Sequence, residues 1–266
     1  MAVEVAREQG RPGIEVVDLN RGGSSPVVPA GNGPLWTPDG TRITFGSPVY
    51  DSILWQPADG SGTPGVLHRA GFASNDGSWS PDGRALAFTG IGESAERQIW
   101  VLSQEAGDWT PRRFLPVPGS TAPGGCAPRF SPDGRWIAYT SSQESGAYEV
   151  WVRAYPGGGQ RTQVSVGGGH NAVWSPDGRE LFYRDGDRFY ALPVRLGPTF
   201  SAERPRPLFT GPYLDGGVYS APVYDVTRDG RRFLVVQVGD EERAPRRFHL
   251  AQNWSEELKA KVPTTR

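Results

Sequence analysis

The stretch Trp174-Ser175-Pro176-Asp177-Gly178, followed by the strand-like run Arg179-Glu180-Leu181-Phe182-Tyr183, decides the fold because the chain repeats it. The same phrase, with Thr for Ser or Phe for Trp, stands at residues 36–40, 79–83 and 130–134, and a weaker copy stands at 226–230. Successive copies begin 43, 51, 44 and 52 residues apart. A period of this size predicts an array of similar supersecondary units.

Each copy of the phrase has the residues of a tight hairpin turn. Proline presets the backbone angle of the first central position, aspartate suits the next, and glycine takes the left-handed conformation that closes the loop. The Ser or Thr before proline can form a hydrogen bond forward onto the turn. Recurrence in one turn context favours this structural role over metal binding or acid catalysis. The turn residues are Asp39, Gly40, Asp82, Gly83, Asp133, Gly134, Asp177, Gly178, Asp229 and Gly230.

The residues around each turn have the period of β-strands. The third and fifth positions after each glycine are apolar, as at Leu181 and Tyr183, and the Trp of the phrase is expected to pack between neighbouring units. A third strand follows in every unit, as at 150–152, and short runs such as 162–164 supply a fourth. Four short antiparallel strands per unit, repeated about five times, predict an all-β chain with the architecture of a β-propeller.

The turn phrase resembles the WSPDG repeat of TolB-like, WD-repeat-like bacterial propellers, and the resemblance covers nearly the whole chain. The passage 224–234, together with 253–259, is similar to the end of the propeller at the C-terminus of many bacterial receptor-like serine/threonine kinases. The sequence contains none of the kinase motifs themselves, so the likeness is to the accessory domain. The resemblance implies a sensor or scaffold in an extracytoplasmic, periplasmic location, although this sequence shows no signal peptide.

We expect one propeller domain over residues 1–266, with closing strands in 1–30 and a C-terminal tail at 255–266. One short helical turn is expected within residues 253–264. Five units are clear. The N-terminal strands either complete the fifth unit, which gives five blades, or form an incomplete sixth blade. The six-bladed alternative is favoured because the third-strand pattern occurs six times, counting residues 14–19. An incomplete blade would expose a strand edge, and we expect such an edge to favour a homodimer.

Composition excludes several classes of function. A formal net charge of −1 gives no electrostatic basis for binding nucleic acid. A single cysteine, Cys126, excludes an internal disulfide and a cysteine zinc cluster. No apolar run reaches the length of a membrane span, and no G-x-S-x-G motif of a hydrolase nucleophile is present.

Candidate ligand residues follow from strand order. Propellers bind ligands at the central channel, where the innermost strands begin, and the innermost strand should be the one before each turn phrase. Polar side chains at these strand starts are the candidates for binding a divalent cation as cofactor, or a polar ligand: Asn32, Asn75, Asp76, His170 and Asn171. The alternative is that they satisfy backbone groups or hold channel water. No catalytic residue is assigned.

The sequence therefore favours a non-enzymatic recognition or scaffold propeller that binds a protein, a peptide or a small ligand at one face or at the channel mouth. A first alternative is a metal-assisted hydrolase or lactonase whose cation is held by Asp76, His170 and the nearby asparagines. A second is a structural propeller that is part of a larger kinase or peptidase.

Overall fold

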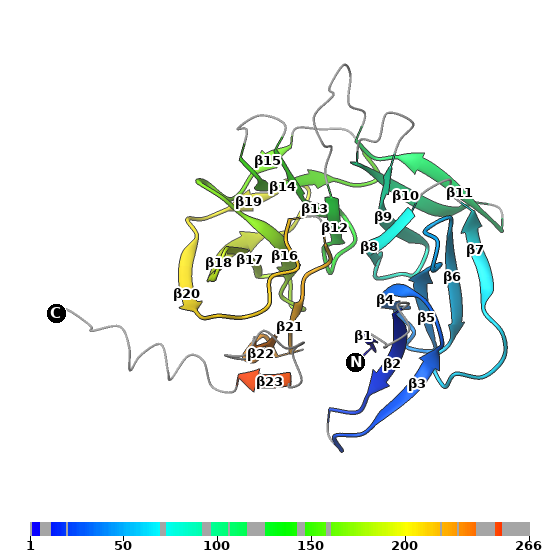
Figure 1. Ribbon diagram of the computed structural model, residues 1–266. Coiled ribbons are helices and arrows are strands. Elements are labelled where there is room, and N and C mark those ends of the chain that lie inside the picture. Colours follow the sequence, from blue (N-terminus) through cyan, green and yellow to red (C-terminus); the bar gives the residue numbers. More distant parts are fainter. Residues whose placement is uncertain are drawn as a thin grey trace. The chain divides into compact units, whose positions relative to one another are not determined.

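The computed structural model describes residues 2–5, 12–19, 21–69, 73–91, 97–105, 107–115, 126–142, 147–157, 161–218, 220–227, 229–237 and 248–251. These residues form strands β1 to β23, and no helix is found among them (Figure 1). Accordingly, no helix in the described ranges is long and apolar enough to cross a membrane. The expected C-terminal tail, 255–266, lies outside the described residues.

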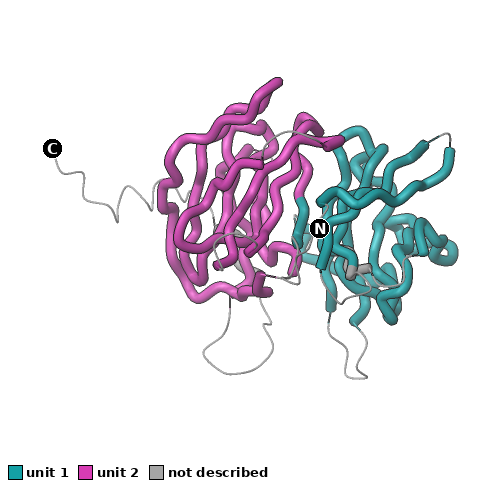
Figure 2. The backbone as a smooth tube through the Cα atoms, turned by 90° about the horizontal axis from the view of Figure 1, so that it is seen from above, with its two compact units in different colours: residues 1–128 teal, residues 129–266 magenta. Residues whose placement is uncertain are grey.

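The chain forms two compact units, residues 1–128 and 129–266 (Figure 2). The first unit contains three complete sheets, each an antiparallel meander. Sheet one has the order β1-β2-β3, sheet two β4-β5-β6-β7, and sheet three β11-β10-β9-β8. Their strands are β1 (Ala2–Val5), β2 (Gly13–Val17), β3 (Ser24–Val28), β4 (Asn32–Trp36), β5 (Arg42–Gly46), β6 (Ser52–Pro57), β7 (Gly65–Arg69), β8 (Ala73–Trp79), β9 (Ala85–Ile91), β10 (Arg97–Glu105) and β11 (Asp108–Arg113).

The remaining strands form three further sheets. Sheet four has the order β12-β13-β14-β15, and the boundary between the units falls within its first strand. Sheet five has the order β16-β17-β18-β19 with β20 also paired to β18, and sheet six is β21-β22-β23. The strands are β12 (Cys126–Phe130), β13 (Trp136–Ser141), β14 (Glu149–Ala154), β15 (Thr162–Gln163), β16 (His170–Trp174), β17 (Glu180–Asp185), β18 (Arg188–Arg195), β19 (Ser201–Ala202), β20 (Arg206–Thr210), β21 (Tyr224–Val226), β22 (Phe233–Val236) and β23 (Phe248–Ala251).

The core of each unit lies between consecutive sheets. One cluster joins sheets four and five through side chains such as Trp136, Leu181 and Leu192, and another joins sheets five and six through Phe182 and Phe233. The predicted apolar positions after each turn are all buried. In sheets two to five the residue between them is buried too, because these middle strands have neighbours on both faces, whereas Leu234 in sheet six is only partly buried. Burial on both faces explains why the intervening residue is small or apolar in these strands and never charged.

The turn phrase folds in the same way in all of its copies. In the copy at 175–178, the amide of Gly178 donates to the carbonyl of Ser175 at 2.9 Å, and Gly178 has φ 71°. The Ser175 hydroxyl donates to Oδ1 of Asp177 at 2.7 Å and accepts from the amide of Glu180 at 2.8 Å. The Asp177 Oδ1 also accepts from the amide of Arg179 at 3.1 Å. The hydroxyl and carboxylate thus satisfy backbone donors that the turn leaves without a ladder partner.

The first strand of several sheets also carries a bulge, three residues before the turn phrase. The register shifts between Asn32 and Leu35 in β4 and between His170 and Val173 in β16. Within these shifts Gly33 and Asn171 both have φ 55°, and Ala127, at the equivalent place in β12, has φ 51°. A bulge redirects the side chains at the start of the strand, so it decides how the candidate ligand residues point.

Candidate functional site

The structure places the sequence candidates at strand starts in two different units. Asn32 begins β4, and Asn75 and Asp76 lie in β8, all in the first unit. His170 and Asn171 begin β16 in the second unit. The side chain of Asn75 lies outside the described residues. His170 and Asn171 are therefore the two candidates whose surroundings can be analysed as one site.

Asn32 and Asp76 are bound into their own sheets. The buried Asn32 amide donates to the carbonyl of Ser47 at 2.9 Å, which fixes the start of β4 to the β5–β6 turn. The buried Asp76 accepts from the amide of Thr89 through Oδ1 at 3.3 Å. In both contacts a polar side chain forms a hydrogen bond with a backbone group. This is the role that the sequence analysis gave as the alternative to ligand binding.

Cys126, the first residue of β12, is buried and forms no disulfide bond. Burial raises the pKa of the Cys126 thiol, and the negative charge of Asp76 raises it further. Because the thiolate is the reactive form of cysteine, this residue is a structural side chain at neutral pH.

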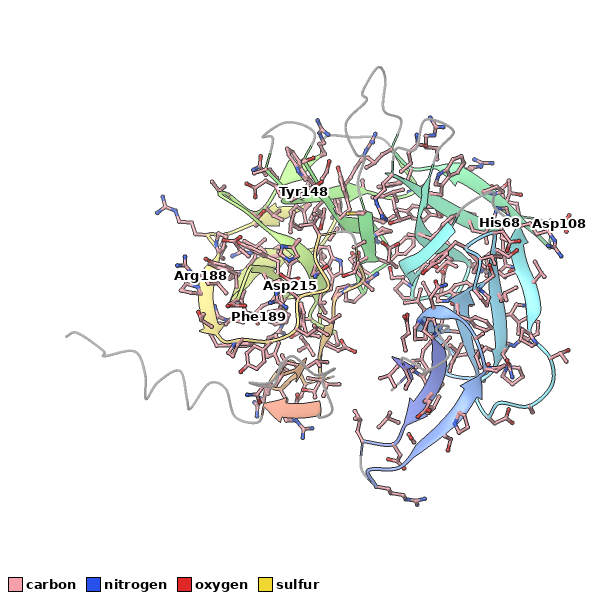
Figure 3. The ribbon with its side chains drawn as sticks, viewed as in Figure 1. His68, Asp108, Tyr148, Arg188, Phe189 and Asp215 are labelled. Atoms are coloured by element: carbon pink, nitrogen blue, oxygen red, sulfur yellow. The ribbon has the colours of Figure 1, made fainter. Side chains whose placement is uncertain are left out.

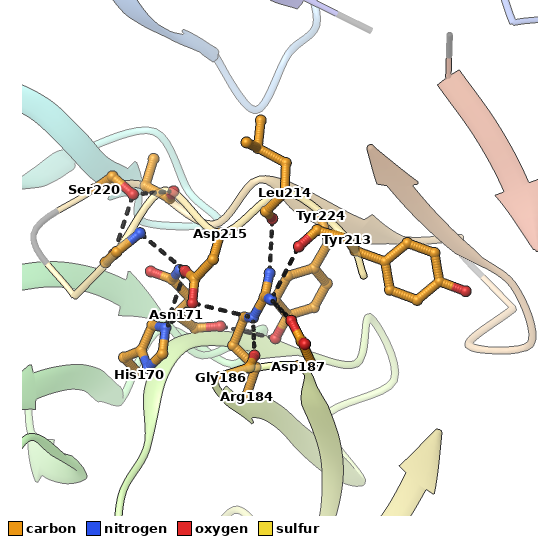
Figure 4. A network of polar contacts seen from close by, with 12 residues as sticks. His170, Asn171, Arg184, Gly186, Asp187, Tyr213, Leu214, Asp215, Ser220 and Tyr224 are labelled. Carbon is orange, nitrogen blue, oxygen red and sulfur yellow. Dashed lines mark hydrogen bonds and ion pairs between the residues drawn. The ribbon is translucent and has the colours of Figure 1, made fainter. Parts of the chain in front are cut away.

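His170 belongs to a polar network in the second unit (Figure 4). Its Nε2 lies 3.1 Å from both carboxylate oxygens of Asp215, and its side chain is 8% exposed. Asp215 belongs to the segment between β20 and β21, and its Oδ1 also accepts from the amide of Gly217 at 2.8 Å. Burial alone would raise the pKa of Asp215, but the Gly217 amide and His170 lower the pKa below its usual value.

Arg184, the second-to-last residue of β17, has a side chain that is 0% exposed. Its Nε donates to the carbonyl of Gly186 at 2.8 Å, and its Nη1 and Nη2 donate to the carbonyls of Leu214 and Tyr213 at 2.7 and 3.3 Å. The guanidinium carbon also lies 4.9 Å from the centre of the Phe189 ring (Figure 3 labels Phe189 and Asp215). Arg184 therefore holds the same segment that Asp215 ties to His170.

Asn171 adds a buried polar group beside this network. The residue is 0% exposed, and its backbone carbonyl accepts from the hydroxyl of Tyr224 at 2.7 Å. Neither atom of its side-chain amide has a hydrogen-bond partner within the described part of the chain. A buried amide without partners costs free energy, so this position has the chemistry of a site for water or for a polar ligand group.

The loop that leads into His170 is fixed by a buried acid, Glu149. Its Oε1 accepts from the amides of Gly167 and Gly168 at 2.9 and 3.1 Å, and its Oε2 accepts from the hydroxyl of Ser165. Gly167 and Gly168 have φ 84° and 128°, where side chains are strained. Two of the three glycines before His170 thus bind an internal carboxylate, and the third, Gly169, donates its amide to the carbonyl of Tyr148.

Sequence reasoning missed Arg184, Asp215 and Glu149, although Arg184 stands out in the repeat. Arg184 occupies the position six residues after the turn glycine, where the other units have Gly46, Thr89, Thr140 and Val236. A large cation among small residues at one repeat position is a signal that a unit-by-unit comparison can find. Asp215 lies in a segment without repeat character, and the sequence alone gives no reason to pair it with His170.

The network can bind and orient polar groups through His170, Arg184 and Asn171. Within the described ranges, no group of three or more His, Cys, Asp or Glu side chains is placed to hold a metal ion.

Comparison with known proteins gives the fold a precedent. No protein-family model matches the chain. The uncharacterized peptidase YuxL of Bacillus subtilis is 32% identical to it over 120 residues, which are 42% of this chain and 17% of that protein. The chain thus spans about a sixth of this curated relative.

Two solved structures share the fold over most of the chain. TolB from Acinetobacter baumannii superposes with a TM-score of 0.69 at 17% identity, over 90% of this chain and 58% of that one. A putative TolB from Agrobacterium tumefaciens superposes with a TM-score of 0.68 at 20% identity, over 92% and 86% of the two chains. The chain has the fold of a TolB-like β-propeller.

Proposed function

We propose that this protein is a recognition or scaffold module that binds a protein or peptide partner. The partner contacts the strand ends that lie opposite the Asp–Gly turns. In sheet five the start of β16 lies at this end of the strands, and Val166, in the loop before β16, has 88% of its surface exposed. The loop is not loose there, because Ser165 and Gly167 on either side are bound to Glu149. An apolar side chain held outward on an anchored loop is the observation that carries the proposal.

The chemistry of the described residues agrees with binding. His170 is engaged by Asp215, Arg184 by backbone carbonyls, and the Cys126 thiol is buried with a raised pKa. By resemblance to TolB-like propellers, the proposed location is extracytoplasmic. The net charge of −1 gives nucleic acid no role as a partner.

Site-specific photo-crosslinking tests this function. A photo-reactive residue at position 166 should capture a distinct partner from an extract of the source cells, and Val166→Asp should abolish binding of that partner without lowering the melting temperature. Thr199 is the matched control position, because it is exposed in the β18–β19 hairpin at the Asp–Gly edge. Equal capture from positions 166 and 199 would reject the proposed face.

The second candidate is a hydrolase, metal-assisted or of the lactonase kind, and the likeness to a Bacillus subtilis peptidase favours it. The same likeness supports a propeller that belongs to a larger peptidase. Hydrolysis of amino-acid p-nitroanilides and of simple lactones, lost on adding a chelator and restored by a divalent cation, would establish the metal-assisted enzyme. A melting temperature that a chelator leaves unchanged, with no turnover, would exclude it.

A further inference from the structure

The segment 211–217, here called the strap, is held at the head of sheet five by contacts that resemble those of a bound peptide. The carbonyls of two successive residues, Tyr213 and Leu214, accept from the guanidinium of Arg184. The carboxylate of the next residue, Asp215, lies on His170. Main-chain carbonyls and an acidic side chain are the groups that an incoming acidic peptide would offer.

The cationic side of this contact is built into the sheet. Arg184 is fully buried, and its hydrogen bonds all go to neutral carbonyls. The nearest carboxylate oxygens, on Asp215 and Asp187, are 3.8 and 3.9 Å from its nitrogens. A buried guanidinium needs a compensating negative charge, and Asp215 is the carboxylate that also contacts His170.

The Asp215 side chain is placed so that another carboxylate could take its position beside His170 and Arg184. Its carboxylate accepts from the Gly217 amide and lies against His170 and Arg184, yet 31% of the side chain is exposed to solvent. The groups that receive it are far less accessible, since His170 and Arg184 are 8% and 0% exposed. The unpartnered Asn171 amide, fully buried next to His170, provides a further donor and acceptor at the same strand end.

We propose that His170, Arg184 and Asn171 form a binding site for the carboxylate of a peptide, and that Asp215 is its built-in occupant. A ligand carboxylate exchanges with the Asp215 side chain while Arg184 keeps its bonds to the strap carbonyls. The strap therefore lowers the affinity for weak acidic ligands and releases the site to a ligand that makes further contacts. The peptide nature of this ligand rests on the proposed recognition function.

Removing Asp215 and supplying a free carboxylate tests the site. Asp215→Ala should lower the melting temperature, and acetate should raise it again by about 3 °C once its concentration reaches ten times the Kd. Chloride at equal ionic strength should not have this effect, and acetate should leave the wild-type melting temperature unchanged. If Asp215→Ala does not fold in chloride, the yield of folded protein on refolding in acetate measures the same rescue.

Two variants serve as controls. Asp187→Ala removes a carboxylate at a similar distance from Arg184, but one that is 63% exposed and outside the strap, so acetate should not stabilise it. Asp215→Asn fills the same volume with a neutral amide and should block the rescue. Equal responses of Asp215→Ala to acetate and chloride would overturn the proposed site.

Peptides then distinguish the two sources of carboxylate. Acetyl-Gly-Glu-Gly-amide offers an acidic side chain, and Gly-Gly-Gly with a free C-terminus offers a terminal carboxylate. Stabilisation of Asp215→Ala by either peptide identifies the ligand group, whereas rescue by acetate alone would reject a peptide as the ligand. Crosslinking at position 166 uses neither the variant nor acetate, so a failure of the carboxylate site leaves that test of the recognition function intact.

Discussion

At the scale of single residues, the Ser or Thr of the turn phrase acts both as donor and as acceptor. In the first copy, the Thr37 hydroxyl donates to Oδ1 of Asp39 at 2.5 Å and accepts from the amide of Arg42 at 3.1 Å. Asp39 also accepts from the amide and the hydroxyl of Thr41 at 3.1 and 2.8 Å. These bonds favour the charged carboxylate and lower the pKa of Asp39 to about 2, with the Thr37 hydroxyl as the largest cause.

Replacing Thr37 with alanine should therefore raise the pKa of Asp39 from about 2 toward its usual 3.8. Carbon-detected NMR titration of the Asp39 carboxyl would measure the shift. Ser80→Ala is the matched control, because Ser80 makes the same contact to Asp82 in the next copy of the turn. That variant should raise the pKa of Asp82 and leave Asp39 unchanged. An Asp39 pKa unaffected by the loss of Thr37 would show that the hydroxyl is not the cause.

Replacement of a turn glycine should destabilise the protein. Gly178→Val forces a β-branched residue to φ 71° and should lower the free energy of unfolding by about 1–3 kcal/mol. A Cβ at Gly178 would also lie 2.9 Å from Cδ1 of Leu196, whereas a Cβ at Gly40 has no atom within 4 Å. Gly178→Val should accordingly cost more than Gly40→Val in urea denaturation. Equal costs, or no relief of the excess by Leu196→Ala, would contradict the steric contribution.

At the scale of elements, the loop before β16 depends on Glu149. The side chain is buried and accepts from three donors, so Glu149→Gln removes the negative charge and one of the two accepting oxygens. We expect the free energy of unfolding to fall by about 1–3 kcal/mol. Hydrogen exchange of the Gly167 and Gly168 amides should also become faster.

Glu105→Gln is the control for this substitution. Glu105 forms an ion pair with Arg112 at 2.9 Å on the surface, where both side chains are largely exposed. Its loss should change the free energy of unfolding by about 0–1 kcal/mol. Similar effects at positions 105 and 149 would mean that the loop does not need the buried carboxylate.

The elements themselves were largely predictable, since the turn phrase and its flanking alternation mark the first and second strands directly. The prediction of third strands at residues such as 150–152 was confirmed, because β-branched and aromatic residues there occupy a doubly packed sheet. The bulge at Asn171 was not predictable: Gly33, Ala127 and Asn171 share its backbone conformation but no residue type. Without the bulge, the direction of the His170 and Asn171 side chains cannot be derived.

At the scale of the whole molecule, the repeat predicted the TolB-like propeller fold but not the network in the second unit. The fold of a repeat protein follows from the residues that its units have in common. Arg184 and Asp215 are residues at which one unit differs from the others, so the repeat does not predict them. The described strands form six sheets, and the first and last have three strands where the inner ones have four or five. The blade count and the homodimer expected from an incomplete blade stay predictions, which light scattering of the purified protein would test for assembly.

The stability of the protein in acid depends on the aspartates of several turns together. Hydrogen bonds from neighbouring Ser or Thr hydroxyls hold the pKa values of Asp39, Asp82, Asp177 and Asp229 below 3.8 in the folded state. Between these lowered values and 3.8, the unfolded chain binds more protons than the folded one, so stability falls as pH falls. The contribution of these four aspartates to the urea midpoint should therefore be constant above about pH 5 and should fall as the pH drops below 3.8.

The contribution of the turns to that drop can be isolated in one protein. Replacing the Ser or Thr of all four turns with alanine returns the folded-state pKa values toward those of the unfolded chain, so the difference in bound protons becomes small. This variant should be less stable than the wild type at pH 6, and its urea midpoint should fall less steeply between pH 4 and pH 2. A slope equal to that of the wild type would place the acid sensitivity elsewhere, with Asp215 as the next residue to test, because its pKa is also lowered.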